Sequence, residues 1–202
     1  MAKLYFRYGA VGSAKTLNLL AVAHNYRQQE KRILIVKPAL DTRFGANQVR
    51  SRAGLEQQAD IVLGSGQAID ESKLAGIDCL LVDECQFLEP QVIDQLRFIT
   101  TEFDVPVICY GLRTDFKRHL FPGSKRLLEL CDAIEEVKTT CAFCNKKAVY
   151  NLKMVDGLAV GEDNPGPVVE LGCEEKYLPT CAACYETKIT ESGAKIASND
   201  RS

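Results

Sequence analysis

The chain has 202 residues, of which 46% are hydrophobic and 26% charged, and its formal net charge is −2. This apolar content excludes a disordered chain, and the acidic balance argues against a protein that its overall field draws to nucleic acid or anionic membranes. The first residues, MAKLYFRYGA, lack the apolar core and cleavage site of a signal peptide, and the apolar runs are too short to span a bilayer. We therefore expect a soluble, cytoplasmic protein without a membrane partner or a stable nucleic-acid partner.

Up to residue 138, short apolar runs alternate with segments of helical periodicity. The predicted strands are Lys3–Tyr8, Arg32–Lys37, Ala59–Leu63, Asp78–Val82, Val105–Tyr110 and, at an edge, Glu135–Lys138. The predicted helices are Thr16–Gln29, Pro90–Phe103 and Ser124–Ala133. This alternation predicts an α/β domain over residues 1–138, with an open, mostly parallel sheet flanked by helices.

After residue 138, glycine, proline and paired cysteines replace the long apolar runs. A unit of about 50 residues rarely holds together by its core alone and needs a staple. Residues 139–187 are therefore predicted to form a second, small and β-rich domain, and residues 188–202 a polar tail. We expect the chain from Glu186 onward to be frayed.

A loop with two glycines separates the first predicted strand from the first predicted helix. It consists of Gly9, Ala10, Val11, Gly12, Ser13, Ala14, Lys15 and Thr16. In a phosphate-binding loop, backbone N–H groups at a helix N-terminus hold the nucleotide phosphates, the lysine neutralises them and the hydroxyl reaches Mg²⁺. The pattern predicts such a loop, and an ordinary strand–turn–helix connection is the simpler alternative.

One position departs from the phosphate-loop pattern, because Ala14 stands where the pattern has glycine. If the loop keeps its usual path, we expect the Ala14 methyl to add crowding or torsional strain. The alternative is an adapted loop in which Gly12 supplies the flexibility.

Two adjacent carboxylates follow the strand that ends at Val82. Asp83 is placed at the carboxyl end of that strand, where ligands bind in open α/β sheets, and it is predicted to hold Mg²⁺. Glu84 points to the other side of an extended backbone and has a separate task. In an NTPase such a residue positions water, and in a small-molecule kinase it takes the proton from the attacking hydroxyl, so both alternatives stay open. A GTPase is disfavoured, because the segment that begins at Asn145 ends in Ala148 instead of the aspartate that reads guanine.

Nine cysteines in a chain without an export signal do not indicate a disulfide framework. Four lie in or beside apolar segments and are predicted to be small buried residues: Cys79, Cys85, Cys109 and Cys131. Four others form two CxxC pairs, Cys141 with Cys144 and Cys181 with Cys184, a spacing typical of a structural zinc site. Redox chemistry is the main alternative, but it usually accompanies a βαβ pattern, which this region lacks. Cys173 is left over.

The segment between the two pairs, Val149–Tyr177, is long for a loop in a small domain. Loops of such length are usually lids or are disordered. Since the predicted zinc site fixes both of its ends, we expect a lid.

Together these motifs resemble the type II thymidine kinases, cytosolic enzymes of animals and bacteria that transfer a phosphoryl group from ATP to thymidine. The resemblance runs from Lys3 to about Thr187. It rests on the phosphate loop, on the segments KPALDTRF, DECQF and YGLRTDF that begin at Lys37, Asp83 and Tyr110, and on the cysteine pairs around a loop that ends in EKY at Tyr177. It implies a P-loop (RecA-like) fold with a zinc-binding domain that carries a lid (lasso) loop. It also implies Mg²⁺ with ATP, structural Zn²⁺, and phosphorylation of the thymidine 5′-hydroxyl in nucleotide salvage for DNA synthesis.

The same resemblance implies roles for individual residues. Glu84 is the implied catalytic base, and Arg43 is an implied phosphate contact. The implied magnesium ligands are Thr16, Asp41 and Asp83, and the implied neighbours of the nucleotide include Asp83, Glu84, Cys85 and Gln86. Thymidine would contact Phe87, Leu112, Phe116, Phe121 and Tyr177, and the backbone of Val168, Val169, Glu170, Leu171 and Gly172. Similar enzymes are tetramers inhibited by dTTP, so a homotetramer with this feedback inhibitor is expected.

Simpler interpretations exist for several of these residues. The four apolar pocket residues fit an ordinary core, Asp41 and Arg43 fit a surface ion pair, and Tyr177 fits a strand. Two alternative functions also stay open. One is a zinc-ribbon P-loop ATPase acting on nucleic acid, which would need a basic stripe with stacking aromatics. The other is a degenerate nucleotide-binding protein whose turnover is weakened by Ala14.

Overall fold

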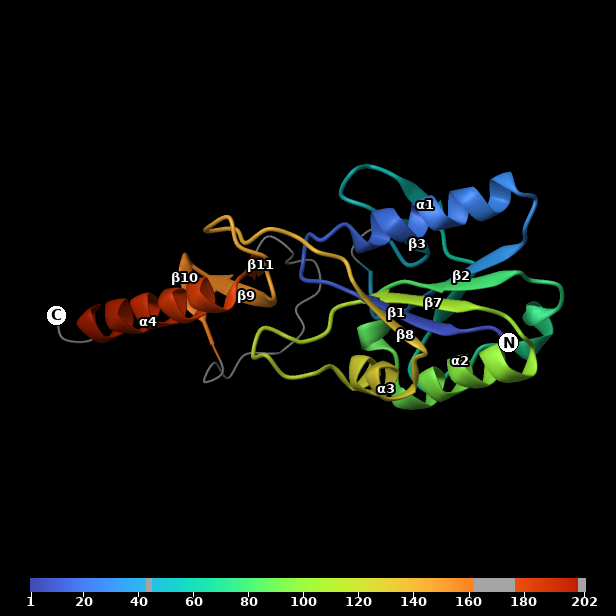
Figure 1. Cartoon of the computed structure of the whole chain (residues 1–202). Helices are drawn as coiled ribbons and strands as arrows, with labels where there is room; N and C mark the ends of the chain where they lie inside the picture. Colours follow the sequence, from blue (N-terminus) through green and yellow to red (C-terminus); the bar gives the residue numbers. More distant parts are fainter. Residues whose placement is uncertain (43–44, 162–176, 200–202) are drawn as a thin grey trace.

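The computed structural model describes residues 1–42, 45–161 and 177–199 (Figure 1). Its larger unit is a six-stranded sheet with the order β5-β2-β6-β7-β1-β8, and all neighbouring strands run parallel. The strands are β1 (Leu4–Tyr8), β2 (Ile33–Pro38), β5 (Ile61–Leu63), β6 (Cys79–Val82), β7 (Val107–Gly111) and β8 (Ala133–Glu136). The predicted open α/β sheet is confirmed.

Helices cover both faces of this sheet. Helix α1 (Lys15–Gln28) lies on one face, and α2 (Pro90–Glu102) and α3 (Pro122–Leu130) lie on the other (Figure 1). Both α2 and α3 begin with a proline, because the first helical position needs no N–H donor. Two short 3-10 helices, η1 (Glu71–Leu74) and η2 (Cys85–Phe87), lie in the connections. A hairpin of β3 (Gln48–Arg50) and β4 (Glu56–Gln58), which the sequence did not predict, contacts α1.

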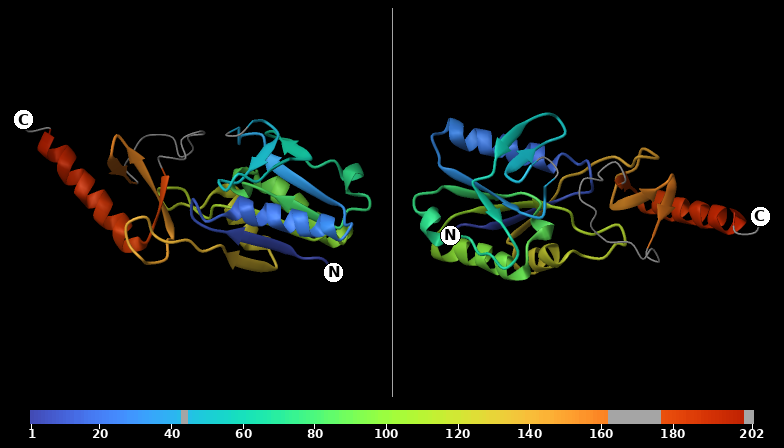
Figure 2. Two further views of the ribbon diagram at one scale, coloured as in Figure 1. Left: turned by 90° about the horizontal axis from the view of Figure 1, so that it is seen from above. Right: turned by 180° about the vertical axis from the view of Figure 1, so that it is seen from behind.

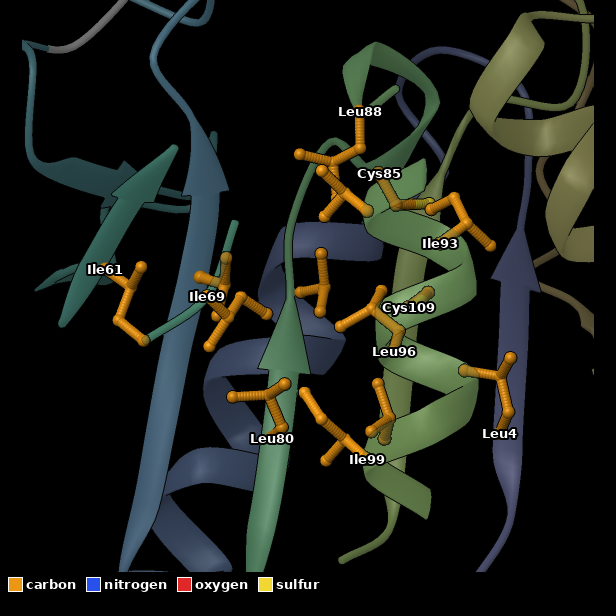
Figure 3. Close-up of a cluster of buried hydrophobic side chains, with 14 of the residues drawn as sticks. Leu4, Ile61, Ile69, Leu80, Cys85, Leu88, Ile93, Leu96, Ile99 and Cys109 are labelled. Atoms are coloured by element: carbon orange, nitrogen blue, oxygen red, sulfur yellow. The ribbon is translucent and has the colours of Figure 1, made fainter. Parts of the chain in front are cut away.

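Two hydrophobic clusters fill the spaces between these layers. In the larger one, Ile93, Leu96 and Ile99 of α2 pack against strand residues such as Leu80 and Cys109 (Figure 3). The central strands β6 and β7 are buried at every position, which explains the uninterrupted apolar runs in their sequences. The second cluster lies between α1 and the opposite face of the sheet.

The cysteines of the α/β unit behave as small apolar side chains. Cys79, Cys85 and Cys109 are fully buried, which confirms the prediction for these three, whereas Cys131 is only half-buried. Burial raises the pKa of the Cys79 thiol to about 11, so this group is protonated and unreactive at neutral pH.

The second unit combines a three-stranded antiparallel sheet with a long helix. The sheet has the order β10-β9-β11, and its strands are β9 (Tyr150–Val155), β10 (Leu158–Val160) and β11 (Tyr177–Thr180). Helix α4 (Ala182–Asn199) packs on this sheet around Leu152, Ala159 and Tyr185. The unit lies beyond the carboxyl ends of the parallel strands and projects from that end of the molecule in all views (Figures 1 and 2).

Three sequence predictions need correction. Between Glu186 and Asn199 the chain is helical instead of frayed, since α4 continues to Asn199 and its Ser192 hydroxyl accepts a hydrogen bond from the Ala159 N–H of β10 at 2.8 Å. The segment between the cysteine pairs is not one loop, because its first part folds into the β9–β10 hairpin. Helix α3 does not reach residue 133, which already belongs to β8; Cys131 is extended (φ −72°, ψ 149°) and ends the helix. None of the helices in the described part of the chain is long and apolar enough to cross a membrane.

Candidate active site

The predicted phosphate loop lies at the carboxyl end of β1 and leads directly into α1. Its first residue, Gly9, has a steric reason to be glycine. A β-carbon at Gly9 would lie 2.4 Å from both the Ser13 hydroxyl oxygen and the Val137 carbonyl oxygen. Any larger residue would therefore push the loop away from its position against the chain that follows β8.

Ala14 adopts a left-handed backbone conformation (φ 62°, ψ 28°). Its carbonyl accepts the hydrogen bond from the Asn18 N–H at 3.0 Å, so the residue forms the start of α1. Gly12 is also left-handed (φ 73°). The loop therefore uses two left-handed positions, of which only one is glycine, and this geometry supports torsional strain at Ala14. A left-handed residue with a β-carbon costs about 1–2 kcal/mol.

The ammonium group of Lys15 lies within the loop. Its Nζ donates to the carbonyls of Gly9 (3.2 Å) and Ala10 (2.9 Å) and lies 3.3 Å from the Ser13 hydroxyl. The side chain is almost fully buried. These contacts fix one positive charge at the place where the loop would hold phosphate oxygens.

Thr16, in the first turn of α1, meets Asp83 although β1 and β6, the strands that precede them, are not neighbours. The Thr16 hydroxyl oxygen lies 3.3 and 3.2 Å from the two carboxylate oxygens of Asp83. Strand β7 separates β1 from β6 in the sheet, so this contact spans one intervening strand. A hydroxyl and a carboxylate are the hard oxygen donors that suit Mg²⁺, which also keeps waters and binds substrate phosphates. The pair fits the predicted metal ion.

Asp41, the third predicted magnesium ligand, is buried beside a lysine. Its Oδ2 lies 3.4 Å from Nζ of Lys37, and this buried lysine also donates to the Gln48 carbonyl of the β3–β4 hairpin at 2.9 Å. Arg43 lies outside the described residues, so neither its predicted phosphate contact nor its alternative ion pair is described. A metal-binding role for Asp41 stays a prediction.

Glu84 is held in a constrained conformation at the end of β6. Its backbone is left-handed (φ 48°, ψ 39°) and its side chain is buried. Gln86 Nε2 donates to the Glu84 carboxylate at 2.5 Å, and Gln86 Oε1 accepts from the Leu112 N–H at 3.0 Å. Gly111 leaves room for this arrangement, because a β-carbon there would lie 2.5 Å from Gln86 Oε1. Strained backbone held by its surroundings is frequent at functional sites.

A cavity of about 360 Å³ joins these groups. The phosphate loop and the first turn of α1 form one wall, residues 50–53 of the hairpin turn form a second, and Glu84 and Leu112 complete the lining. One guanidinium nitrogen of Arg52 lies 3.8 Å from the position that a β-carbon of Gly12 would take. The cavity therefore brings the predicted phosphate site, the predicted base and an arginine from the hairpin to one place.

Four of the predicted thymidine-binding side chains form two aromatic pairs, and the fifth, Leu112, lines the cavity. Phe87 and Phe121 meet edge to face with ring centroids 5.8 Å apart, and Phe116 lies against Tyr177 at 6.3 Å. Phe116 and Phe121 are buried, but neither belongs to the hydrophobic clusters found among the described residues. Their burial is compatible with ordinary core residues as well as with the predicted pocket, so the thymidine contacts stay a prediction.

Part of the predicted site falls on residues that the structure does not describe. These are the five backbone contacts predicted for the base, from Val168 to Gly172, together with the leftover Cys173. The predicted lid falls largely on the same range, residues 162–176. Tyr177 is described and is the first residue of β11, so its interpretation as a strand residue is correct, and it also contacts Phe116.

The four cysteines of the two CxxC pairs gather at one point. Their Sγ atoms all lie within 4.8 Å of one another. Cys144 Sγ lies 3.7 Å from Sγ of both Cys181 and Cys184, close to the edge of about 3.8 Å that four sulfurs at 2.3 Å from a tetrahedral zinc ion would form. Burial opposes ionisation of Cys141, but hydrogen bonds from neighbouring N–H and thiol groups outweigh it and lower its pKa to about 6. The donor set and its geometry fit zinc.

Three features of the site are not among the sequence predictions. Gln86 links Glu84 to the Leu112 N–H, a role in addition to its predicted place beside the nucleotide, which stays a prediction. The turn between β3 and β4, which contains Arg52, has only a weak sequence signal for a phosphate contact, a glycine beside basic residues. Asn151 of β9 accepts the Val11 N–H of the phosphate loop at 2.8 Å, and no local pattern indicates a contact across 140 residues.

A family model described as thymidine kinase matches residues 2–185 of the chain. The chain belongs to the thymidine kinase family. It is similar to the thymidine kinase of Lactiplantibacillus plantarum, with 44% identity over 92% of this chain and 96% of the relative. The thymidine kinase of Enterococcus faecalis is 43% identical over 92% of this chain and 95% of the relative. Among solved structures, the Pif1 helicase of Candida albicans covers 67% of this chain and 36% of its own at 12% identity, and its TM-score of 0.40 is too low to carry a conclusion.

Strain at Ala14 predicts opposite effects for two neighbouring substitutions in this thymidine kinase family member. Ala14→Gly should raise the free energy of unfolding by about 0.5–1 kcal/mol, because the left-handed strain disappears while the unfolded chain gains freedom. Gly12→Ala should lower it by about 1–2 kcal/mol, since it places a β-carbon in the same conformation without a steric clash. Denaturant titration measures both. An unchanged or reduced stability of Ala14→Gly contradicts the strain.

The cysteine cluster predicts one equivalent of zinc in the freshly purified protein. Cys144→Ser should release it and destabilise the second unit, because structural zinc contributes directly to folding. Cys131→Ser is the matched control, since this half-buried cysteine belongs to the α/β unit and should leave the zinc content unchanged. Elemental analysis checks both variants, and a parent protein without zinc would refute the assignment.

Proposed function

We propose that the protein is an ATP-dependent thymidine kinase, which transfers the γ-phosphoryl group of ATP to the 5′-hydroxyl of thymidine. One observation carries the proposal: a single cavity is lined by the phosphate loop and by Glu84 in a chain of this family. Such a cavity can hold a triphosphate and an acceptor hydroxyl side by side. Proximity of this kind is the main contribution that a protein makes to phosphoryl transfer.

The phosphate side of the reaction would use the loop and the first turn of α1. The backbone N–H groups and the Lys15 ammonium hold the β- and γ-phosphates. Thr16 and Asp83 are the residues that would hold Mg²⁺, which when bound neutralises charge that develops on the phosphoryl oxygens. Arg52 adds a guanidinium group at the cavity wall, where it can contact phosphate oxygens as Arg43 is predicted to do.

Glu84 would act as the general base. Its carboxylate lines the same cavity and accepts the proton of the 5′-hydroxyl as the hydroxyl oxygen attacks the γ-phosphorus. Gln86 orients this carboxylate through its hydrogen bond and is itself fixed by the Leu112 N–H. These two hydrogen bonds hold the Glu84 carboxylate in one position, whereas an exposed glutamate side chain would sample many rotamers.

The thymine ring would bind beside the aromatic pairs. Leu112 lines the cavity, and the Phe116–Tyr177 pair connects the α/β unit to β11 of the second unit. Aromatic faces suit a nucleobase because every base has a π-face on which to stack. We expect the backbone of residues 168–172 to read the edge of the base and the loop to close over it.

Several properties of this proposed enzyme rest on the sequence resemblance alone. They are inhibition by dTTP, assembly as a homotetramer, a cytoplasmic location and a magnesium ligand at Asp41. The alternative of a nucleic-acid-acting ATPase gains no support, since the family model and the curated relatives are thymidine kinases over almost the whole chain.

The substrate is tested directly by incubation with γ-labelled ATP. The label should move to thymidine in preference to uridine, and single-stranded DNA should not stimulate phosphate release. Release of phosphate that depends on single-stranded DNA would favour the ATPase instead. Nucleotide binding without transfer to any acceptor would favour the degenerate protein.

Glu84→Gln should lower kcat by on the order of 10²–10⁴, because it keeps the shape of the side chain and removes the base. The affinity for Mg·ATP should change little. Glu102→Gln, on the exposed end of α2, is the matched control and should leave kcat unchanged. Turnover of Glu84→Gln within a few-fold of the parent would exclude Glu84 as the base.

Phe116→Ala should raise the KM for thymidine by about 5–150-fold, which corresponds to the roughly 1–3 kcal/mol of a base–aromatic contact. The KM for ATP should change far less. Phe98→Ala removes an aromatic ring that is 45% exposed on α2 and serves as the control. Steady-state kinetics with each substrate varied in turn separate the two effects, and equal increases for both substrates would assign Phe116 to the core.

A further inference from the structure

Asn151 connects three parts of the molecule that are distant in sequence. It lies in β9 of the second unit and is only 5% exposed. Its Oδ1 accepts a hydrogen bond from the Val11 N–H at 2.8 Å, and its Nδ2 donates to the Thr114 carbonyl at 3.0 Å. One buried side chain thus ties the second unit to the phosphate loop and to the segment after β7.

These two partners need a side chain that both accepts and donates, and the Asn151 amide does so through two different atoms. The Val11 N–H is a donor and requires an acceptor, whereas the Thr114 carbonyl is an acceptor and requires a donor. The chemistry of the partners therefore fixes the orientation of the Asn151 amide. Aspartate at this position could accept from Val11 but could not donate to Thr114 when ionised.

The two partners of Asn151 belong to the proposed binding sites of different substrates, Val11 to that of ATP and Thr114 to the segment proposed to bind thymidine. Val11 lines the cavity as part of the phosphate loop. Thr114 is buried and lies two residues before Phe116, the aromatic residue proposed to contact thymine. A displacement of either backbone group changes its hydrogen bond to the same amide, so the position of one partner depends on the position of the other.

We propose that Asn151 is a positioning residue that couples nucleotide binding at the phosphate loop to thymidine binding at the aromatic pocket. A ligand that orders the backbone at Val11 also orders the backbone at Thr114 through Asn151, and the reverse holds as well. The second ligand then costs less conformational entropy to bind, so each ligand raises the affinity for the other. This inference rests on the proposed function, because it assigns the phosphate loop to ATP and the Phe116 segment to thymidine. It adds a role that neither the sequence predictions nor the phosphate-loop motif contains.

Tyr185 provides a matched control for this role. Its hydroxyl donates to the Phe116 carbonyl at 2.6 Å, so it also links the second unit to the segment after β7. The single O–H proton of Tyr185 is donated to the Phe116 carbonyl, so this hydrogen bond does not involve the phosphate loop. Tyr185→Phe therefore removes one link between the two units while the bridge from Val11 to Thr114 stays intact.

Calorimetric titration measures the coupling. The dissociation constant of Mg·AMP-PNP is determined without thymidine and at saturating thymidine, and the ratio of the two values is the coupling factor. We expect a factor of about five or more in the parent, within the usual range of coupling between sites. Asn151→Ala should reduce the factor to near one, and Tyr185→Phe should weaken thymidine binding without changing the factor.

Asn151→Asp keeps the size of the side chain and the acceptor for Val11, and it should also abolish the coupling. Its added charge changes both nucleotide affinities together, so the ratio still isolates the coupling. Zinc content and melting temperature verify the fold of each variant. If Asn151→Ala fails to fold, the coupling factor of Asn151→Asp tests the role of Asn151. A parent that binds both ligands with a factor near one overturns the inference, as does an equal loss of coupling in Tyr185→Phe. A parent that binds neither ligand instead overturns the proposed function.

Discussion

The contact between the Thr16 hydroxyl and the Asp83 carboxylate is the interaction on which the proposed site depends. It exists because β1 and β6 run parallel on either side of β7, so that the phosphate loop and the acidic strand end at the same edge of the sheet. The apolar runs of the central strands determine this arrangement through burial on both faces. Glu84 follows Asp83 directly, and the same edge therefore carries the proposed magnesium ligands and the proposed base. The second unit stands beyond this edge and contributes Asn151 and Tyr177.

Two residues with β-carbons adopt left-handed backbone at this edge, Ala14 before α1 and Glu84 after β6. Each conformation costs on the order of 1–3 kcal/mol and persists only where surrounding contacts determine it. Around Glu84 these contacts are identifiable, because Gln86 binds the carboxylate and Gly111 leaves the space that Gln86 needs. Around Ala14 the helix start fixes the backbone. The stability of the fold thus maintains backbone strain at Ala14, beside the proposed phosphate site, and at Glu84, the proposed base.

Local patterns predict the parts of the site whose chemistry lies within a few residues of sequence. The phosphate loop, the carboxylates after β6 and the cysteine pairs all have fixed spacings, and the structure places each as expected. The β9–β10 hairpin also has a local signal in the Asp156-Gly157 dipeptide, whose residues are both left-handed as a two-residue turn requires. Contacts that depend on the tertiary fold could not be predicted. Asn151 meets Val11 only because the second unit docks on the loop, and α4 is helical to Asn199 because its inner face packs on β10.

A double-mutant cycle tests the central claim that Thr16 and Asp83 hold one magnesium ion beside the phosphates. The dissociation constant of AMP-PNP is measured for the parent, Thr16→Val, Asp83→Asn and the double variant, first with Mg²⁺ and then with EDTA. With Mg²⁺, each single variant should weaken binding about tenfold, which is 1.4 kcal/mol, and the double variant should be little weaker than either. With EDTA, Asp83→Asn should not weaken binding, because it removes a negative charge that faces the phosphates. Additive losses with Mg²⁺, or the same losses with EDTA, would contradict the shared metal site.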